Sequence, residues 1–322
     1  MRLLFTLFAL WAPLQAVASP DYPTRPITMI VPAAAGGTTD VLARIAGKIM
    51  SADLGQPIII ENVGGAGGSI GVLRVVRAEP NGYTLSFANM GQIAANATLY
   101  PKLNYDPRRD LAPIGLFATV PMVLSTSKAS GLADMSSFLR KLREKDNIVN
   151  FANSGPGSTG HLAAVTFLSV TNTKATLVAY RGAGPAMNDM LAGVVDAIID
   201  QTVTMIPMHT GGSLTAIAVS SKGRLSQIPD VPTFEEAGVP EFDLTVWNAV
   251  AAPRGTPPAI IDRLEKALRM AVDDPEVRQR FVDLAAEAPT PDAQGAEALR
   301  KVIAADVDRL AQIIKAAGIT GE

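Results

Sequence analysis

Two segments of the chain combine glycines with hydroxyl side chains in a pattern that suits an anion. VPAAAGGTTD covers residues 31–40, FANSGPGSTGH covers residues 151–161, and each joins an apolar run to a helical pattern. The first N–H groups of a helix have no partners inside the helix, and glycines let a ligand approach them closely. Either segment alone also fits an ordinary capped turn between a strand and a helix. Together they predict a site that holds a carboxylate between them.

The side chains next to these glycines have simple local roles as well. Thr38 or Thr39 can cap the helix that follows the first segment. Asp40 is most simply an acidic first-turn residue, which the helix dipole favours. In the second segment, Ser158 and Thr159 add two hydroxyls beside the free amides. A carboxylate fits such a set of donors without any lysine or arginine.

Ser158 and His161 raise the alternative of a secreted hydrolase with a serine nucleophile. The elbow around such a serine has the pattern Gly-x-Ser-x-Gly, whereas residues 157–160 are Gly-Ser-Thr-Gly, one residue short. His161 follows Ser158 by only three residues on one helical turn, which is a poor geometry for activating the hydroxyl. We therefore expect no catalytic residue, and we expect His161 to support the helix start.

A third glycine-rich segment, ENVGGAGGSIG at residues 61–71, follows a predicted strand and precedes a predicted helix, as nucleotide-binding loops do. A dinucleotide-binding pattern needs glycine at position 70, where the chain has Ile70, and a P-loop needs a lysine that does not follow here. The segment therefore predicts a tight turn whose backbone passes close to the loop of Gly36 and Gly37. Direct contact of Gly67 or Ser69 with a ligand stays an alternative.

Composition excludes several classes of function. The chain has 322 residues, of which 48% are hydrophobic and 18% charged, enough for a sizeable folded core. A net charge of −2 and 5% aromatics leave no basic surface or stacking platform for nucleic acid. The chain has no cysteine and only two histidines, so thiolate chemistry is excluded and no metal site or cofactor is expected.

Residues 1–18 have the features of a secretory signal peptide. Arg2 supplies the basic start, residues 3–11 form a short apolar run, and small residues precede the cleavage expected after Ala18. The apolar run is too short for a permanent bilayer anchor. We expect a soluble mature protein in the periplasm of a Gram-negative cell.

Strand and helix patterns alternate twice along the chain. Apolar runs at residues 27–32, 57–62 and 82–89 predict strands, and periodic patterns at residues 40–54 and 70–80 predict helices. Residues 111–119 and 121–126 predict two further strand-like segments. A second alternating block starts after a break near residues 125–134, and residues 258–317 are mostly helical in pattern. The sequence therefore predicts an α/β fold of two lobes, with a ligand at the carboxyl ends of the strands between them.

The order of several motifs resembles one family along nearly all of the mature chain. The matching segments are YPTRPITMIVPAAAGGTTDVLAR, LGQPIIIENVGGAGGSIG, PNGYTL, SGPGSTGH, YRGAGPAMNDMLAGVVDAIIDQ, IPDVPTFEEAG and WNAVAAPRGTP. The chain is similar to the tripartite tricarboxylate transporter substrate-binding proteins, the Bug- and TctC-type periplasmic solute receptors. Residues 89–116 and the segment YRGAGPAMNDM look most like the aspartate-binding, BugD-like branch.

The resemblance implies a two-lobed periplasmic binding protein fold, type II-like, with its ligand cleft between the lobes. It implies lobe 1 at residues 19–125 plus 246–322, and lobe 2 at residues 126–245. The implied function is capture of a small carboxylate, aspartate-like or a dicarboxylate, for a membrane permease, by a protein expected to be a monomer. Carried over by motif, the ligand-binding positions are Ala35, Gly36, Gly37, Thr38, Thr39, Asp40, Asn89, Met90, Gly91, Gly157, Ser158, Thr159, Asp200 and Gln201, with Gly67, Ser69 and His161 in support.

Two charged residues near the expected cleft, Asp200 and Arg181, can each be interpreted in two ways. In the aspartate-like interpretation Asp200 meets the ligand's ammonium group, and in the other it is a strand-end residue bonded to nearby amides. Arg181 has the geometry to clamp a carboxylate, but the resemblance implies no such clamp, so we favour a surface or structural role. The segments AAAGG and GPGSTGH differ from the commoner forms in the family, which affects the ligand assignment more than the receptor assignment.

Overall fold

The computed structural model describes residues 22–146 and 149–316, so the expected signal peptide at residues 1–18 lies outside the described residues. Strand β1 (Ile27–Val31) shows how the sequence pattern sets the layers. Ile27 and Met29 belong to one apolar cluster and Ile30 to another, because successive strand side chains point to opposite faces of a sheet. A strand that is buried on both faces needs the near-continuous apolar run that the sequence has here.

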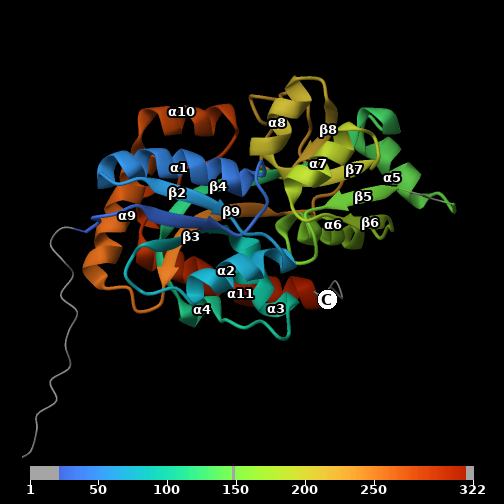
Figure 1. Ribbon diagram of the computed structural model, residues 1–322. Helices are drawn as coiled ribbons and strands as arrows, with labels where there is room; N and C mark the ends of the chain where they lie inside the picture. Colours follow the sequence, from blue (N-terminus) through green and yellow to red (C-terminus); the bar gives the residue numbers. More distant parts are fainter. Residues whose placement is uncertain (1–21, 147–148, 317–322) are drawn as a thin grey trace, which may run out of the picture.

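The first lobe is built on a mixed sheet. Its strand order is β2 (Ile58–Asn62), β1, β3 (Thr84–Asn89), β9 (Thr245–Pro253) and β4 (Leu111–Ser127). β1, β2 and β3 are parallel, whereas β9 runs antiparallel between β3 and β4. The sheet therefore combines four strands from residues 27–127 with β9, which follows much later in the chain (Figure 1).

β4 corrects one detail of the sequence interpretation. The segments at residues 111–119 and 121–126 form one strand of 17 residues, which continues through Pro121. Up to Pro121 the strand pairs with β9, and from Met122 onward it pairs with β7 and β8. Proline removes a backbone donor, and here it stands where the strand changes partners. β4 thus runs through both lobes, and the predicted lobe boundaries at residues 125 and 246 stay predictions.

The second lobe repeats the parallel arrangement on the far half of β4. β7 (Ala197–Gln201) pairs with β4, β5 (Asn150–Asn153) pairs with β7 in parallel, and β6 (Thr176–Ala179) pairs with β5. β8 (Leu214–Val219) lies on the other side of β4. Five phenylalanines pack together beneath this sheet, mostly edge to face, at positions 138, 151, 167, 234 and 242.

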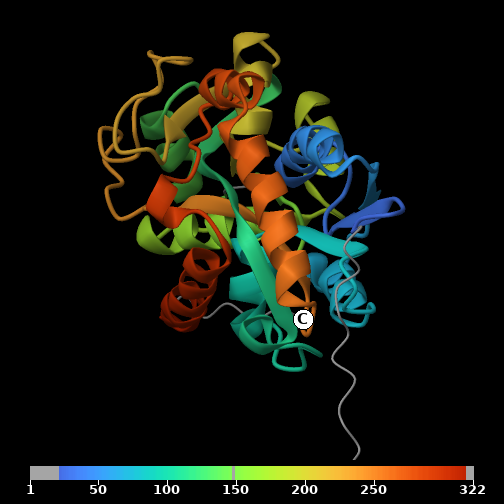
Figure 2. The ribbon, with the colours of Figure 1, turned by 90° about the vertical axis from the view of Figure 1, so that its left-hand side faces the viewer.

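Helices cover both sheets. Beside the first sheet lie α1 (Thr38–Leu54), α2 (Ser69–Val76), α9 (Pro258–Asp273) and α11 (Ala296–Ala316), and Figure 2 shows α9 running along β4. None of the helices in the described ranges has both the length and the apolar composition that crossing a bilayer requires. The others are α3 (Asn96–Leu99), α4 (Pro107–Asp110), α5 (Met135–Arg143), α6 (Thr159–Val170), α7 (Ala183–Leu191), α8 (Thr202–Thr210) and α10 (Pro275–Asp283).

Candidate functional site

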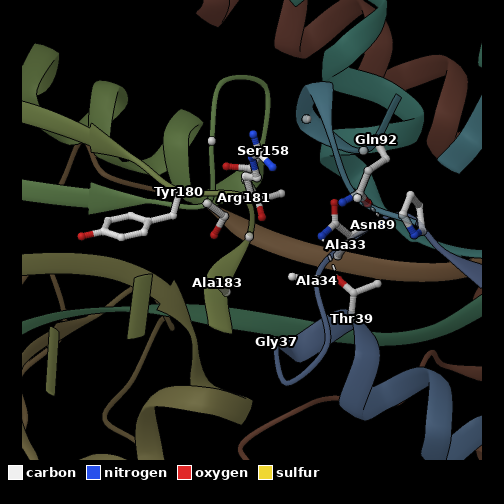
Figure 3. Close-up of a pocket in the computed structure, with 18 of the residues that line it drawn as sticks. Ala33, Ala34, Gly37, Thr39, Asn89, Gln92, Ser158, Tyr180, Arg181 and Ala183 are labelled. Carbon is white, nitrogen blue, oxygen red and sulfur yellow. Dashed lines mark hydrogen bonds between the residues drawn. The ribbon is translucent and has the colours of Figure 1, made fainter. Parts of the chain in front are cut away.

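A cavity of about 320 Å³ lies where the carboxyl ends of two sets of three parallel strands meet, β1 to β3 in the first lobe and β5 to β7 in the second. The loops after β1, β2 and β3 form its wall from the first lobe, and the loops after β5, β6 and β7 form its wall from the second (Figure 3). Open α/β sheets bind ligands at this end. The lining residues are Pro32, Ala33, Ala34, Gly37, Thr38, Thr39, Gly64, Gly65, Ala66, Gly67, Gly68, Asn89, Gln92, Tyr100, Ser154, Gly155, Pro156, Ser158, Thr159, Ala179, Tyr180, Arg181, Gly182, Ala183, Asp200 and Gln201.

The start of α1 presents free amides to this cavity. The expected caps Thr38 and Thr39 lie inside the helix, whose N-cap is Gly37, and no side chain caps it. The N–H groups of Thr38 and Thr39 therefore have no acceptor among the described residues. Both threonines are buried and line the cavity. An uncapped helix start beside a cavity favours the binding of an anion, because the helix dipole and the free amides both attract negative charge.

A hydrogen-bond network fixes this wall from behind. Asn89, the last residue of β3, donates through Nδ2 to Thr39 Oγ1 at 3.1 Å and accepts the N–H of Gly91 at 2.9 Å. Its own N–H donates to Gln92 Oε1 at 2.7 Å. Because Thr39 Oγ1 accepts from Asn89, its hydroxyl proton stays available to a ligand.

The start of α6 forms the facing wall. Ser158 is the N-cap, and its Oγ accepts the N–H of His161 at 3.1 Å. The N–H groups of Thr159 and Gly160 have no acceptor among the described residues. The α7 start is also uncapped, with Gly182 at its N-cap. The second lobe thus offers free amides and the donating hydroxyl of Ser158 opposite those of α1.

The two lobes touch around the cavity. The Tyr100 hydroxyl of the first lobe donates to the carbonyl oxygen of Pro156 in the second at 2.6 Å. Three glycines also allow the lobes to approach closely. An added Cβ on Gly67 would lie 2.7 Å from the Pro156 oxygen. An added Cβ would lie 2.4 Å from Ala34 Cβ on Gly182, and 2.7 Å from the Ala35 oxygen on Gly184. The lobes are therefore closed on one another in this structure.

Two lining residues carry charge. Asp200 is 4% exposed, and burial, opposed by the N–H of Gln201, raises its pKa to about 6. Arg181 lines the cavity from the loop between β6 and α7 and is exposed, so the surface or structural role that we favoured stays a prediction. The Tyr180 ring, by contrast, points away from the other labelled residues in Figure 3, and its hydroxyl donates to Asp189 Oδ2 at 2.7 Å.

The structure brings together about half of the positions expected to bind the ligand. Ala35 and Gly36 face a neighbouring groove with Gly184, and Ser69 faces a groove beside Tyr100. The expected positions in the cavity wall are Gly37, Thr38, Thr39, Asn89, Ser158, Thr159, Asp200, Gln201 and the supporting Gly67, and those outside the lining are Ala35, Gly36, Asp40, Met90, Gly91, Gly157, His161 and Ser69.

Met90 and Gly91 were expected to line the cleft because they follow β3, but both are buried behind it. An added Cβ on Gly91 would lie 3.2 Å from the N–H nitrogen of Thr159 in the other lobe. Gly157 packs under the Tyr100 ring, where an added Cβ would lie 2.5 Å from it. Gly91 and Gly157 therefore allow the two lobes to pack closely against each other.

Sequence reasoning missed Gln92 and Tyr100, and in the loop between β6 and α7 it considered only Arg181. Gln92 and Tyr100 lie beyond the strand end that was searched, and helices rather than loops carry them to the cavity. The β6–α7 loop did have a signal, since Gly182 stands just before a helix and Gly184 in its first turn.

The Ser158–His161 pair is not assembled for catalysis. Ser158 Oγ is hydrogen-bonded to the backbone of His161, whereas His161 Nδ1 is buried with no partner among the described residues. Burial also lowers the pKa of His161. No carboxylate of the described chain orients the ring as an activated serine would require. Within residues 22–146 and 149–316 there is also no group of three acidic or histidine side chains suited to a metal ion.

Asp40 holds the first glycine loop and lies outside the cavity lining. Its Oδ2 accepts the N–H of Gly36 at 3.0 Å and Arg44 Nε at 3.1 Å, and its Oδ1 accepts Asn62 Nδ2 at 2.9 Å. Burial alone would raise the pKa of Asp40, but the hydrogen bonds from Arg44, Gly36 and Asn62 and the charge of Arg44 together lower it below its usual value. A lowered pKa means that the folded state stabilises the ionised carboxylate of Asp40 relative to its protonated form.

We expect Asp40→Asn to reduce the free energy of unfolding by about 1–3 kcal/mol at neutral pH, because hydrogen bonds to a charged group are lost. The wild-type advantage is present above the unfolded pKa near about 4 and is lost as pH falls through the lower folded pKa. Urea unfolding of both proteins at neutral pH and near pH 2 measures this difference. A difference that stays constant with pH would contradict the assignment.

Together, these features define the class of protein: a two-lobed receptor of the periplasmic binding protein type, whose ligand cavity lies between the lobes. The chain belongs to the tripartite tricarboxylate transporter family receptors, the Bug- and TctC-type proteins, and the family matches residues 42–319. The family and the fold expected from the sequence are thereby confirmed.

Three solved structures support this membership. BugD, a periplasmic binding protein, is 34% identical with a TM-score of 0.90, over 94% of this chain and 100% of that one. MatC from Rhodopseudomonas palustris with bound malate is 35% identical with a TM-score of 0.87, over 91% and 100% of the chains. Rpa4515 from R. palustris with adipate is 31% identical with a TM-score of 0.87, over 93% and 99%.

Proposed function

We propose that this receptor works in the periplasm, where it captures an aspartate-like amino acid or a small dicarboxylate. It then delivers the ligand as a monomer to a membrane permease of the tripartite tricarboxylate type. The observation that carries the proposal is the pair of helix starts, α1 and α6, whose free amides face one cavity from opposite lobes. The volume of about 320 Å³ is at the small end for ligand pockets.

In this proposal, the ligand binds as the two lobes close around it. The ligand carboxylate accepts from the amides of Thr38 and Thr39 on one side and of Thr159 and Gly160 on the other. Because both lobes contribute donors, the carboxylate binds the closed form better than the open one and shifts the equilibrium toward it. The hydroxyls of Thr39 and Ser158 add donors whose direction is fixed by their own acceptor bonds.

No step of this function is chemical. The malate of MatC and the adipate of Rpa4515 are both dicarboxylates, which supports the class of ligand proposed here. The alternative of a hydrolase finds no support in the geometry of Ser158 and His161.

A thermal-shift panel of amino acids and organic acids tests the proposal. A ligand at about 100 times its dissociation constant stabilises the folded state by about 2.7 kcal/mol, so we expect the melting temperature to rise by roughly 5 °C or more. Neutral analogues, in which amides replace the carboxylates, are the controls and should give no shift. Absence of any shift across the carboxylates would refute the proposal.

A further inference from the structure

Asp200 has one carboxylate oxygen with no donor. The residue is the fourth of β7, one residue before Gln201, the N-cap of α8, and forms part of the cavity wall. Its Oδ1 accepts the N–H of Gln201 at 2.8 Å, whereas Oδ2 is buried without a hydrogen-bond partner among the described residues. A buried carboxylate oxygen without a donor is costly, so this position favours whatever supplies one.

No charged group within residues 22–146 and 149–316 supplies that donor. β4 and β5, which pair with β7, contain no titratable side chain. The helices packed against β7 carry His161, Asp189 and His209, but Asp189 is bonded to Tyr180 and His209 to the N–H of Ala216. Neither His161 on α6 nor Arg181 on the cavity wall forms a hydrogen bond or an ion pair with Asp200, and burial alone raises the pKa of Asp200.

Oδ2 can therefore be satisfied in two ways: Asp200 binds a proton, or the ligand brings a hydrogen-bond donor. At a pH above about 6 the carboxyl is largely ionised, and an ammonium group would satisfy it with a charge-assisted hydrogen bond. A hydroxyl would satisfy it with a weaker neutral donor. A dicarboxylate that lacks both brings only further acceptors, so it would have to bind together with a proton on Asp200.

We propose that Asp200 makes this receptor selective for carboxylates that carry a hydrogen-bond donor on the carbon skeleton, an ammonium group above all, over dicarboxylates without one. The inference rests on the proposed function and deepens it, since it decides between an amino acid and a plain dicarboxylate. Asp200 is on this view a specificity-determining residue, separate from the amides that hold the carboxylate.

Three ligands with the same four-carbon skeleton test the inference. L-aspartate, L-malate and succinate differ only in an ammonium, a hydroxyl or a hydrogen at one carbon. By calorimetric titration near pH 8, we expect aspartate to bind the wild type at least about tenfold more tightly than succinate, with malate between them. Asp200→Asn keeps the shape but removes the charge, so the ratio should fall to within about threefold.

A pH series gives a second readout that a merely structural role of Asp200 would not move. As pH falls through about 6, succinate should bind the wild type more tightly and aspartate less tightly, because Asp200 gains its own proton. Succinate as tight as aspartate near pH 8, or discrimination that survives in Asp200→Asn, overturns the inference while leaving the carboxylate receptor intact. Failure of all three ligands to bind overturns the inference, and loss of every carboxylate shift in the thermal panel also overturns the proposed function.

Discussion

Gly184→Ala is expected to weaken carboxylate binding by roughly 100-fold, about 2.7 kcal/mol, while the unliganded protein stays folded. Gly184 lies in the first turn of α7, and an added Cβ would stand 2.7 Å from the carbonyl oxygen of Ala35 across the lobe boundary. The backbone of Ala35 cannot yield as a flexible side chain would. The extra methyl therefore acts only against the closed form, and in the open form alanine is the better helix residue.

Calorimetric titration of Gly184→Ala measures the affinity, and thermal melting without ligand measures the stability. Gly223→Ala is the matched control, because Gly223 has an ordinary backbone conformation and an added Cβ would meet nothing within 4 Å. The control should bind as the wild type does. An affinity of Gly184→Ala equal to that of the control would show that the liganded state lacks the contact with Ala35.

The fold was largely predictable because parallel strands buried on both faces need apolar runs, and those runs alternate here with helical periodicity. α8 was missed, since Thr202, Val203 and Thr204 are β-branched and Pro207 lies inside the helix. Packing against β4 and β8 outweighs these weak local preferences. The division of β4 into two segments had a similar cause, because proline normally ends a strand and here marks a change of partner.

The site was predictable only where it is local in sequence. The glycines and hydroxyls before α1 and α6 are recognisable because a helix start needs them within a few residues. Tyr100 reaches the cavity from the end of α3, away from any strand end, and no local pattern marks it. Asp40 shows the converse, since the resemblance placed it among the ligand-binding positions, whereas in the structure it accepts the Gly36 N–H.

Gly68 is expected to matter more for stability than Gly36, where an added Cβ would meet nothing within 4 Å. The segment ENVGGAGGSIG was expected to pass close to Gly36 and Gly37, and the contact in fact falls earlier in that loop. An added Cβ on Gly68 would lie 2.5 Å from the Pro32 carbonyl oxygen and 2.5 Å from Gln92 Cγ. The glycines of this segment thus let the backbone after β2 pack directly on the end of β1.

We expect Gly68→Ala to reduce the free energy of unfolding by about 2–5 kcal/mol, the sum of left-handed backbone strain and overpacking. Gly238→Ala separates these two causes. Its φ of +83° matches the +87° of Gly68, but an added Cβ there meets nothing within 4 Å, so it should cost only about 1–2 kcal/mol. Urea unfolding of both variants measures the difference. Equal losses would mean that strain alone explains Gly68, whereas a larger loss at Gly68 shows that close packing on Pro32 is what requires glycine there.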